Sequence, residues 1–449
     1  MLQFFALGDR DLSFKLPSRP PKFPGRDFAS GRTPPGPSAT AVSPWRSVGS
    51  KLALVALLAA ASVGLIFALS QTARILPADF TNYYAAGKIV RDGQGRRLYD
   101  SGLQRRVEGE VSGHKSTLFQ PFLHPPFEAL LFAALAGLSY PHAFVLWGCL
   151  NLLLAGSVVR LLQLERPCLD GVGHGVWLAV CLLFTLVTLA LGQDAMGLAV
   201  AFLLAFLALK RRLDFVAGMA LGLGLYRFQI LLPFAFVFLL RRRWRLLGGF
   251  AVVGAAEILV SAATVGWSGL LTYANVLVRV GAADSGPWAD SRLALNGMPT
   301  LHGALGALLA HTLPSRYVLI LVLAATLVLL LWAAWALRSL DRPEDPAFNL
   351  GYCLAVIAAL LAGYHAFASE MTPLIVVAFL GLRHEEARKP RAALWRRPCA
   401  LLFLLFVGVF VARAVFQSPP FSVEIFPLLA VVAWLSWELS SLRKPAPAE

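Results

Sequence analysis

The chain has 449 residues, of which 57% are hydrophobic and only 14% are charged. Soluble domains carry about a quarter charged residues, so this composition excludes an ordinary soluble protein. The formal net charge of +15 could indicate a nucleic-acid partner. However, the basic residues cluster at the ends of apolar runs, which is the positive-inside pattern of membrane proteins. We therefore expect membrane lipids, and no nucleic acid, as partners of these charges.

Residues 1–50 hold eight prolines and five glycines and show no hydrophobic period. Such a segment buries too little apolar area to offset the entropy lost on ordering, so we expect a disordered, basic, cytoplasmic tail. It is too long and too rich in proline for a signal peptide. No small-residue cleavage site follows the next apolar run, so that run is expected to stay as an anchor.

Long apolar blocks follow the tail, and each has the length, or nearly the length, needed to cross about 30 Å of hydrocarbon. The clearest are residues 51–70, 246–266, 317–337 and 399–412. Because backbone polar groups must be satisfied internally in lipid, these blocks are predicted to be helices. The expected fold class is all-α: a polytopic membrane domain over residues 51–442 with about 10–12 transmembrane helices. A cytoplasmic tail, 443–449, ends the chain.

The basic segments set the expected topology. With the N-terminus and the segments 209–214 and 241–245 in the cytoplasm, residues 215–240 must cross out and back, turning at 224–229. The run 246–266 then leads to a long outer loop, 267–315. Further basic segments at 338–345 and 383–398 place the later crossings. We expect these at 316–338, 347–364, 371–382, 399–416 and 423–441.

The earlier crossings are less regular. Residues 195–209 are expected to be one crossing, and an even number must separate Asp79 from Gly192. Three apolar blocks lie between them, at 122–138, 141–162 and 174–191. One must be split, re-entrant or non-spanning. The first is the candidate, because Pro125 and Pro126 prevent a regular helix from starting upstream.

This topology gathers polar residues on one side of the membrane. Ionisable groups near membrane depth are costly and are candidates for function by default. The residues expected on the non-cytoplasmic side are Asp79, Gln193, Asp194, Arg227, those of the 267–315 loop, His365 and Glu370. A shared side makes a single site possible.

Each candidate also has a structural interpretation. Asp79 can cap a new helix that carries Tyr83 and Tyr84 on its apolar face, or act as a general base toward a sugar hydroxyl. Gln193 and Asp194 can form a turn and a helix cap, or bind sugar hydroxyls.

Three further candidates are open in the same way. Arg227 can snorkel to lipid headgroups or clamp a phosphate. His124, before the proline pair, can be structural or catalytic, and His365 can be a simple interfacial residue. No metal site is expected, because the five cysteines are scattered, His365 and Glu370 do not share a helix face, and no HExxH motif occurs.

Four segments follow one another along the chain: "ADFTNYYAAGKIVRDGQGRRLYD", "FLHPPFEALLFAALAGLSYPHAFVLWGCLNLLL", "LGQDAMGLAV" with the sequence up to "LLRRRWR", and "GYHAFASEMTPLIV". In this order they resemble glycosyltransferase family 87, whose members are membrane mannosyltransferases of the GT-C fold. The resemblance covers residues from about 75 to 380. Two positions depart from the family: Arg227 stands where it has lysine, and Glu370 where it often has aspartate.

The resemblance implies an inverting hexosyltransferase in a bacterial inner membrane, with its site on the outer face. The donor would be a polyprenyl-phosphate sugar, mannose being the expected hexose, and the acceptor a lipid or glycan. Asp79 would be the general base, and Arg227 and His365 would meet the donor phosphate. The other implied substrate-binding residues are Tyr83, Tyr84, His124, Gln193, Asp194 and Glu370. No cofactor is expected, and a divalent metal is optional.

Two alternatives from other classes are a lipid-linked-sugar flippase and a non-catalytic scaffold. A flippase predicts charges spread through the bilayer midplane. The crossings show few such charges, with Glu257 the main exception. A scaffold predicts that Asp79→Asn behaves like the wild type.

Overall fold

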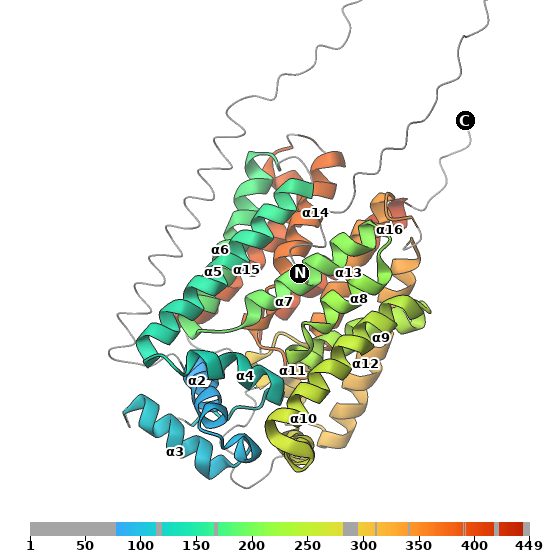
Figure 1. Ribbon diagram of the computed structural model, residues 1–449. Coiled ribbons are helices and arrows are strands. Elements are labelled where there is room, and N and C mark those ends of the chain that lie inside the picture. Colours follow the sequence, from blue (N-terminus) through green and yellow to red (C-terminus); the bar gives the residue numbers. More distant parts are fainter. Residues whose placement is uncertain are drawn as a thin grey trace, which may run out of the picture. The chain divides into compact units, whose positions relative to one another are not determined.

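The computed structural model describes residues 78–113, 119–165, 169–281, 295–309, 312–339, 342–388, 390, 392–416 and 422–442. Every regular element in these ranges is a helix, which confirms the all-α class (Figure 1). The expected tail 1–50, the first apolar block 51–70 and the C-terminal tail 443–449 lie outside the described residues.

A group of short helices opens the described part. They are α2 (Ala78–Arg91), η2 (Gly95–Arg97), α3 (Ser101–Ser112) and α4 (Pro126–Leu135). They share a core rich in aromatic side chains, with Phe80 and Phe132 fully buried. Gly87 of α2 lies directly against the backbone of Phe132, and a Cβ there would sit 2.3 Å from that backbone. This close approach fixes the position of α2, and therefore of Asp79 near its start.

Five helices are long and apolar enough to cross a membrane. They are α5 (Tyr140–Glu165), α6 (Gly171–Leu191), α10 (Trp244–Gly281), α12 (Ser315–Ala336) and α16 (Ile425–Leu442). Large apolar side chains point outward from them, such as Leu153 at 69% and Val328 at 67% exposure. Such surfaces suit lipid rather than water. The chain is therefore an integral membrane protein with several spans, as expected.

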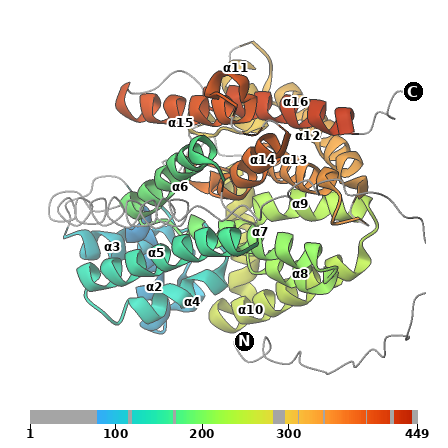
Figure 2. The same ribbon diagram turned by 90° about the horizontal axis from the view of Figure 1, so that it is seen from above.

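Shorter elements lie between and after these spans. They are α7 (Ala195–Lys210), α8 (Asp214–Gly222), η3 (Leu225–Arg227), α9 (Phe228–Leu240), η5 (Leu295–Gly297), α11 (Leu301–Leu309), η6 (Leu337–Ser339), α13 (Pro346–Ala362), η7 (Ala368–Met371), α14 (Leu374–Arg388), η8 (Leu394–Arg396) and α15 (Pro398–Phe416). Viewed from above, α15 and α16 lie on the opposite side of the molecule from α4 and α10 (Figure 2). Since many of these helices are shorter than a bilayer, full-length spans among the described residues are fewer than the 10–12 helices expected.

The block 122–138 is non-spanning by length, in line with the expectation. Its helix α4 has 10 residues, about half of what a crossing needs. It begins at Pro126, with Pro125 in the extended conformation before it. Proline suits the first helical position because its missing N–H has no partner there anyway.

Residues 215–240 do form two helices with a tight turn at 225–227, but the expected pair of full crossings is wrong. Helix α8 has 9 residues and α9 has 13, and their axes are inclined by 65°. Arg243 pairs with Asp214 at 2.6 Å, so the chain returns close to where α8 began. The pair is therefore a broken span or a re-entrant loop, and it carries Arg227 at its bend.

The expected outer loop 267–315 is also wrong in part. Helix α10 continues to Gly281 beyond a break at Gly266, whose φ of 74° favours glycine. Residues 301–309 form α11. The extension of α10 carries Leu277 to the pocket described next.

Candidate functional site

A pocket of about 520 Å³ lies among the ends of these broken and short helices. Its size is within the range of small-molecule sites. Seven residues that the sequence singled out line it: Asp79, Tyr83, His124, Gln193, Arg227, His365 and Glu370. They come from five separate segments of the chain, which the fold brings together at one pocket.

Asp79 lies in the first turn of α2, where the helix dipole favours a carboxylate. Its Oδ2 accepts a hydrogen bond from the amide nitrogen of Gln193 at 2.7 Å. Gln193 follows Gly192, which ends α6 in the left-handed conformation with a φ of 68°. A Cβ at Gly192 would lie 2.5 Å from Phe80, so the junction between α6 and α7 can approach α2 this closely only with glycine.

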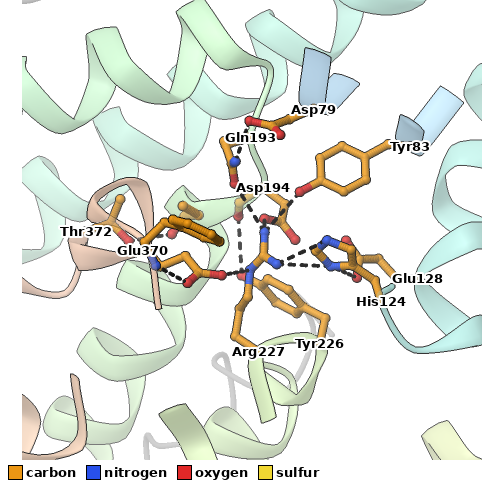
Figure 3. Close-up of polar contacts among 12 residues, drawn as sticks. Asp79, Tyr83, His124, Glu128, Gln193, Asp194, Tyr226, Arg227, Glu370 and Thr372 are labelled. Atoms are coloured by element: carbon orange, nitrogen blue, oxygen red, sulfur yellow. Dashed lines mark hydrogen bonds and ion pairs between the residues drawn. The ribbon is translucent and has the colours of Figure 1, made fainter. Parts of the chain in front are cut away.

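Arg227 is the centre of the polar network, as Figure 3 shows. Its guanidinium is buried and forms ion pairs with Asp194 and with Glu370, the latter at 3.1 Å. It also donates to Tyr83 Oη at 3.0 Å and to Gln193 Oε1 at 3.2 Å. This arrangement excludes the snorkelling interpretation, because the head group points into the protein and is paired there.

His124 and Glu128 complete the network on the side of α4. Nδ1 of His124 lies 3.0 Å from Arg227 Nη1 and 3.0 Å from Glu128 Oε2. The sequence did not single out Glu128, because an acidic residue in the first turn of an apolar helix is common. The usable signal was its spacing from His124, because residues four apart share one side of a turn.

The opposite wall carries His365 and Glu370. Glu370 accepts from the backbone N–H of Phe367 at 2.9 Å and so closes the short helix η7. His365 Nδ1 is buried and makes no hydrogen bond. His302, which the sequence placed in a loop, stacks on Tyr364 with ring centroids 4.0 Å apart.

The side chains of Tyr83 and Tyr84 in α2 point in different directions. Tyr83 contacts Arg227 and lines the pocket. Tyr84 turns away, and its hydroxyl donates to the carbonyl of Leu138 at 2.7 Å. Asp194 lies behind the lining, buried against Arg227. Of the predicted substrate-binding residues, these two have no surface in the pocket.

The environment shifts the titration of the groups around the pocket. Burial raises the pKa of Asp79, against the opposing effects of the Gln193 hydrogen bond and the Arg227 charge. Burial lowers the pKa of His124 to about 3 and that of His365 to about 4. Both imidazoles are therefore neutral near pH 7. A carboxylate with a raised pKa in such a site is suited to take a proton.

Comparisons with known proteins give one positive result. The family model described as Glycosyltransferase family 87 matches residues 122–363, more than half of the chain. No curated protein and no solved structure matches significantly. The matched region contains His124, Gln193, Asp194 and Arg227, while Asp79, His365 and Glu370 lie outside it and are joined to it by the pocket. The chain therefore belongs to glycosyltransferase family 87 and is a membrane glycosyltransferase.

Proposed function

We propose that this enzyme transfers a hexose, mannose in the first instance, from a polyprenyl-phosphate donor to a lipid or glycan acceptor. The observation that carries the proposal is Asp79: a carboxylate with a raised pKa that lines the pocket and is held by Gln193. The site would face the non-cytoplasmic side of a bacterial inner membrane. The positive-inside topology supports that orientation, since it places the basic segments on the other side.

The reaction needs one base and one centre of positive charge. The acceptor oxygen attacks the anomeric carbon while the bond from that carbon to the phosphate oxygen breaks. The hydroxyl proton moves to Asp79, and the polyprenyl phosphate leaves with the electron pair. Attack opposite the leaving group inverts the anomeric carbon. Arg227 supplies positive potential near the negative charge that develops on the phosphate.

The pocket is also suited to a lipid-linked donor. Its lining combines the polar residues named above with aromatic and apolar side chains, namely Phe119, Leu123, Tyr226, Phe228, Leu277 and Phe367. A sugar ring fits among such residues through its apolar faces and its hydroxyls. The chain's own residues suffice for the proposed proton transfer.

The test is transfer of radiolabelled mannose from polyprenyl-phosphate mannose to extracted lipid and glycan acceptors by the full chain in membranes. The same assay with polyprenyl-phosphate glucose tests the choice of hexose. Asp79→Asn should lower the rate by about 10² to 10⁴, the usual contribution of a general base. The control is Asp92→Asn, an exposed carboxylate just beyond α2 that pairs with Lys88. No transfer by the wild type, or full transfer by Asp79→Asn, would refute the proposal.

A further inference from the structure

His124, Glu128 and Asp194 bring three potential metal-ligand atoms within 4.8 Å of one another at the base of the pocket. They come from three places: the loop before α4, the first turn of α4 and the junction between α6 and α7. Glu128 and Asp194 are only 4% and 7% exposed. His124 also lines the pocket, so the cluster lies directly behind the pocket wall.

The carboxylates of this cluster are only partly paired, because Asp194 meets Arg227 through Oδ1 alone. Neither oxygen of Glu128 accepts a hydrogen bond, and Oδ2 of Asp194 accepts none. The nearby His124 Nδ1 does not change this, since its 3.0 Å contact with Glu128 has no hydrogen-bond geometry. A buried carboxylate without a donor or a counter-charge is strongly disfavoured. Oxygens placed this way require a ligand or a proton.

The charge around the pocket is also unbalanced. Among the described residues that line or underlie it, four carboxyl groups (Asp79, Glu128, Asp194 and Glu370) surround one guanidinium, Arg227. Arg227 engages Asp194 through Oδ1 and leaves Oδ2 without a hydrogen bond. That carboxylate can therefore bridge the guanidinium and a second cation, which offsets the repulsion between the two positive charges.

We propose that His124, Glu128 and Asp194 bind one divalent cation at the base of the pocket. One imidazole nitrogen and two carboxylates suit Mn²⁺ better than Ca²⁺ or Mg²⁺, which prefer oxygen ligands alone. Three protein ligands leave coordination positions open to water or to an oxygen of a bound phosphate. The alternative is a proton held between Glu128 and Asp194, which would need no imidazole ligand. Cation binding does not depend on the transfer reaction proposed above.

The experiment measures Mn²⁺ binding to the full chain in detergent after treatment with a chelator. Electron paramagnetic resonance reports free Mn²⁺, and no donor or acceptor is added, so a failure of transfer leaves this test intact. The expected result is one bound Mn²⁺ per chain. Pulsed measurements should show coupling of the bound ion to one imidazole nitrogen, and the coupling should vanish in His124→Ala.

The matched variants are Glu128→Gln and Glu108→Gln. Glu108 is another buried carboxylate, in α3, and it accepts from the backbone of Gln120 outside the cluster. Glu128→Gln should weaken Mn²⁺ binding by about tenfold or more, because affinity follows the number of charged ligands, while Glu108→Gln should bind like the wild type. The inference fails if the wild type binds no Mn²⁺, if bound Mn²⁺ shows no nitrogen coupling, or if Glu128→Gln binds equally well. The wild-type measurements decide the question even if a variant does not fold.

Discussion

The side-chain amide of Gln193 is held at both ends: its nitrogen donates to Asp79 at 2.7 Å, and its oxygen accepts from Arg227 at 3.2 Å. These two bonds fix the orientation of the amide, and each end keeps a second hydrogen-bonding position, one N–H and one lone pair. Gln193 therefore positions the proposed base and links it to the positive centre of the network. We expect it to influence the reaction through Asp79.

The pH dependence of transfer should follow Asp79. The base works only when deprotonated, so the rate falls as pH drops through its pKa. Because burial raises that pKa above the ordinary value of 3.8, the acidic limb of the kcat/KM profile should lie above pH 3.8. Transfer rates between pH 4 and pH 9 in constant ionic strength give the profile. A flat acidic limb down to pH 4 would contradict the assignment.

Gln193→Leu should move this limb to higher pH. The Gln193 hydrogen bond lowers the pKa of Asp79, so its removal leaves the burial effect less opposed. Gln193→Glu should move the limb further, because a second carboxylate disfavours ionisation of the first. The readout is the midpoint of the acidic limb for each variant beside the wild type. A reduced rate with an unchanged midpoint would point to a role in packing alone.

Arg227→Met should destabilise the protein by about 3–5 kcal/mol, since it leaves the buried carboxylates of Asp194 and Glu370 without their partner. The stability of Arg227→Lys should lie between those of the wild type and Arg227→Met, because lysine keeps the charge but lacks the planar guanidinium. Unfolding in detergent measures both. The control is Arg245→Met, at an exposed arginine, which should unfold like the wild type. Equal stability of Arg227→Met and wild type would show that the buried network contributes nothing to the fold.

Gly87→Ala should lower the free energy of unfolding by about 1–3 kcal/mol. The added methyl group would meet the backbone of Phe132, so helices α2 and α4 would have to move apart. Transfer should fall with stability, as α2 carries Asp79. Gly156→Ala in α5 is the matched control, because a Cβ there meets nothing within 4 Å. It should be neutral or slightly stabilising, given the higher helix propensity of alanine. Thermal unfolding measures the stability of both variants, and the transfer assay shows whether activity falls with it.

Hydrophobic blocks and basic segments were sufficient to predict the helical membrane class and the grouping of Asp79, Gln193, Arg227 and His365. They could not reveal that α8 and α9 form a bent pair of short helices in place of two crossings, because hydropathy does not report a bend in the chain. Nor could they show that α10 continues past Gly266, since polar residues such as Ser268 and Thr272 are typical of a loop. Glu128 was missed because Asp194, its other neighbour in the cluster, is distant from it in the sequence.

The ion pairs of Arg227 have a consequence for which ligands the site can bind. A phosphate that approaches this guanidinium competes with the carboxylates of Asp194 and Glu370, and where it displaces one of them anion binding is an exchange of partners. The displaced carboxylate must then find a proton or another counter-charge. A small free anion gains too little elsewhere to offset that cost. A phosphate attached to a sugar and a long apolar chain gains more through its other contacts, so the occupied network itself discriminates between them.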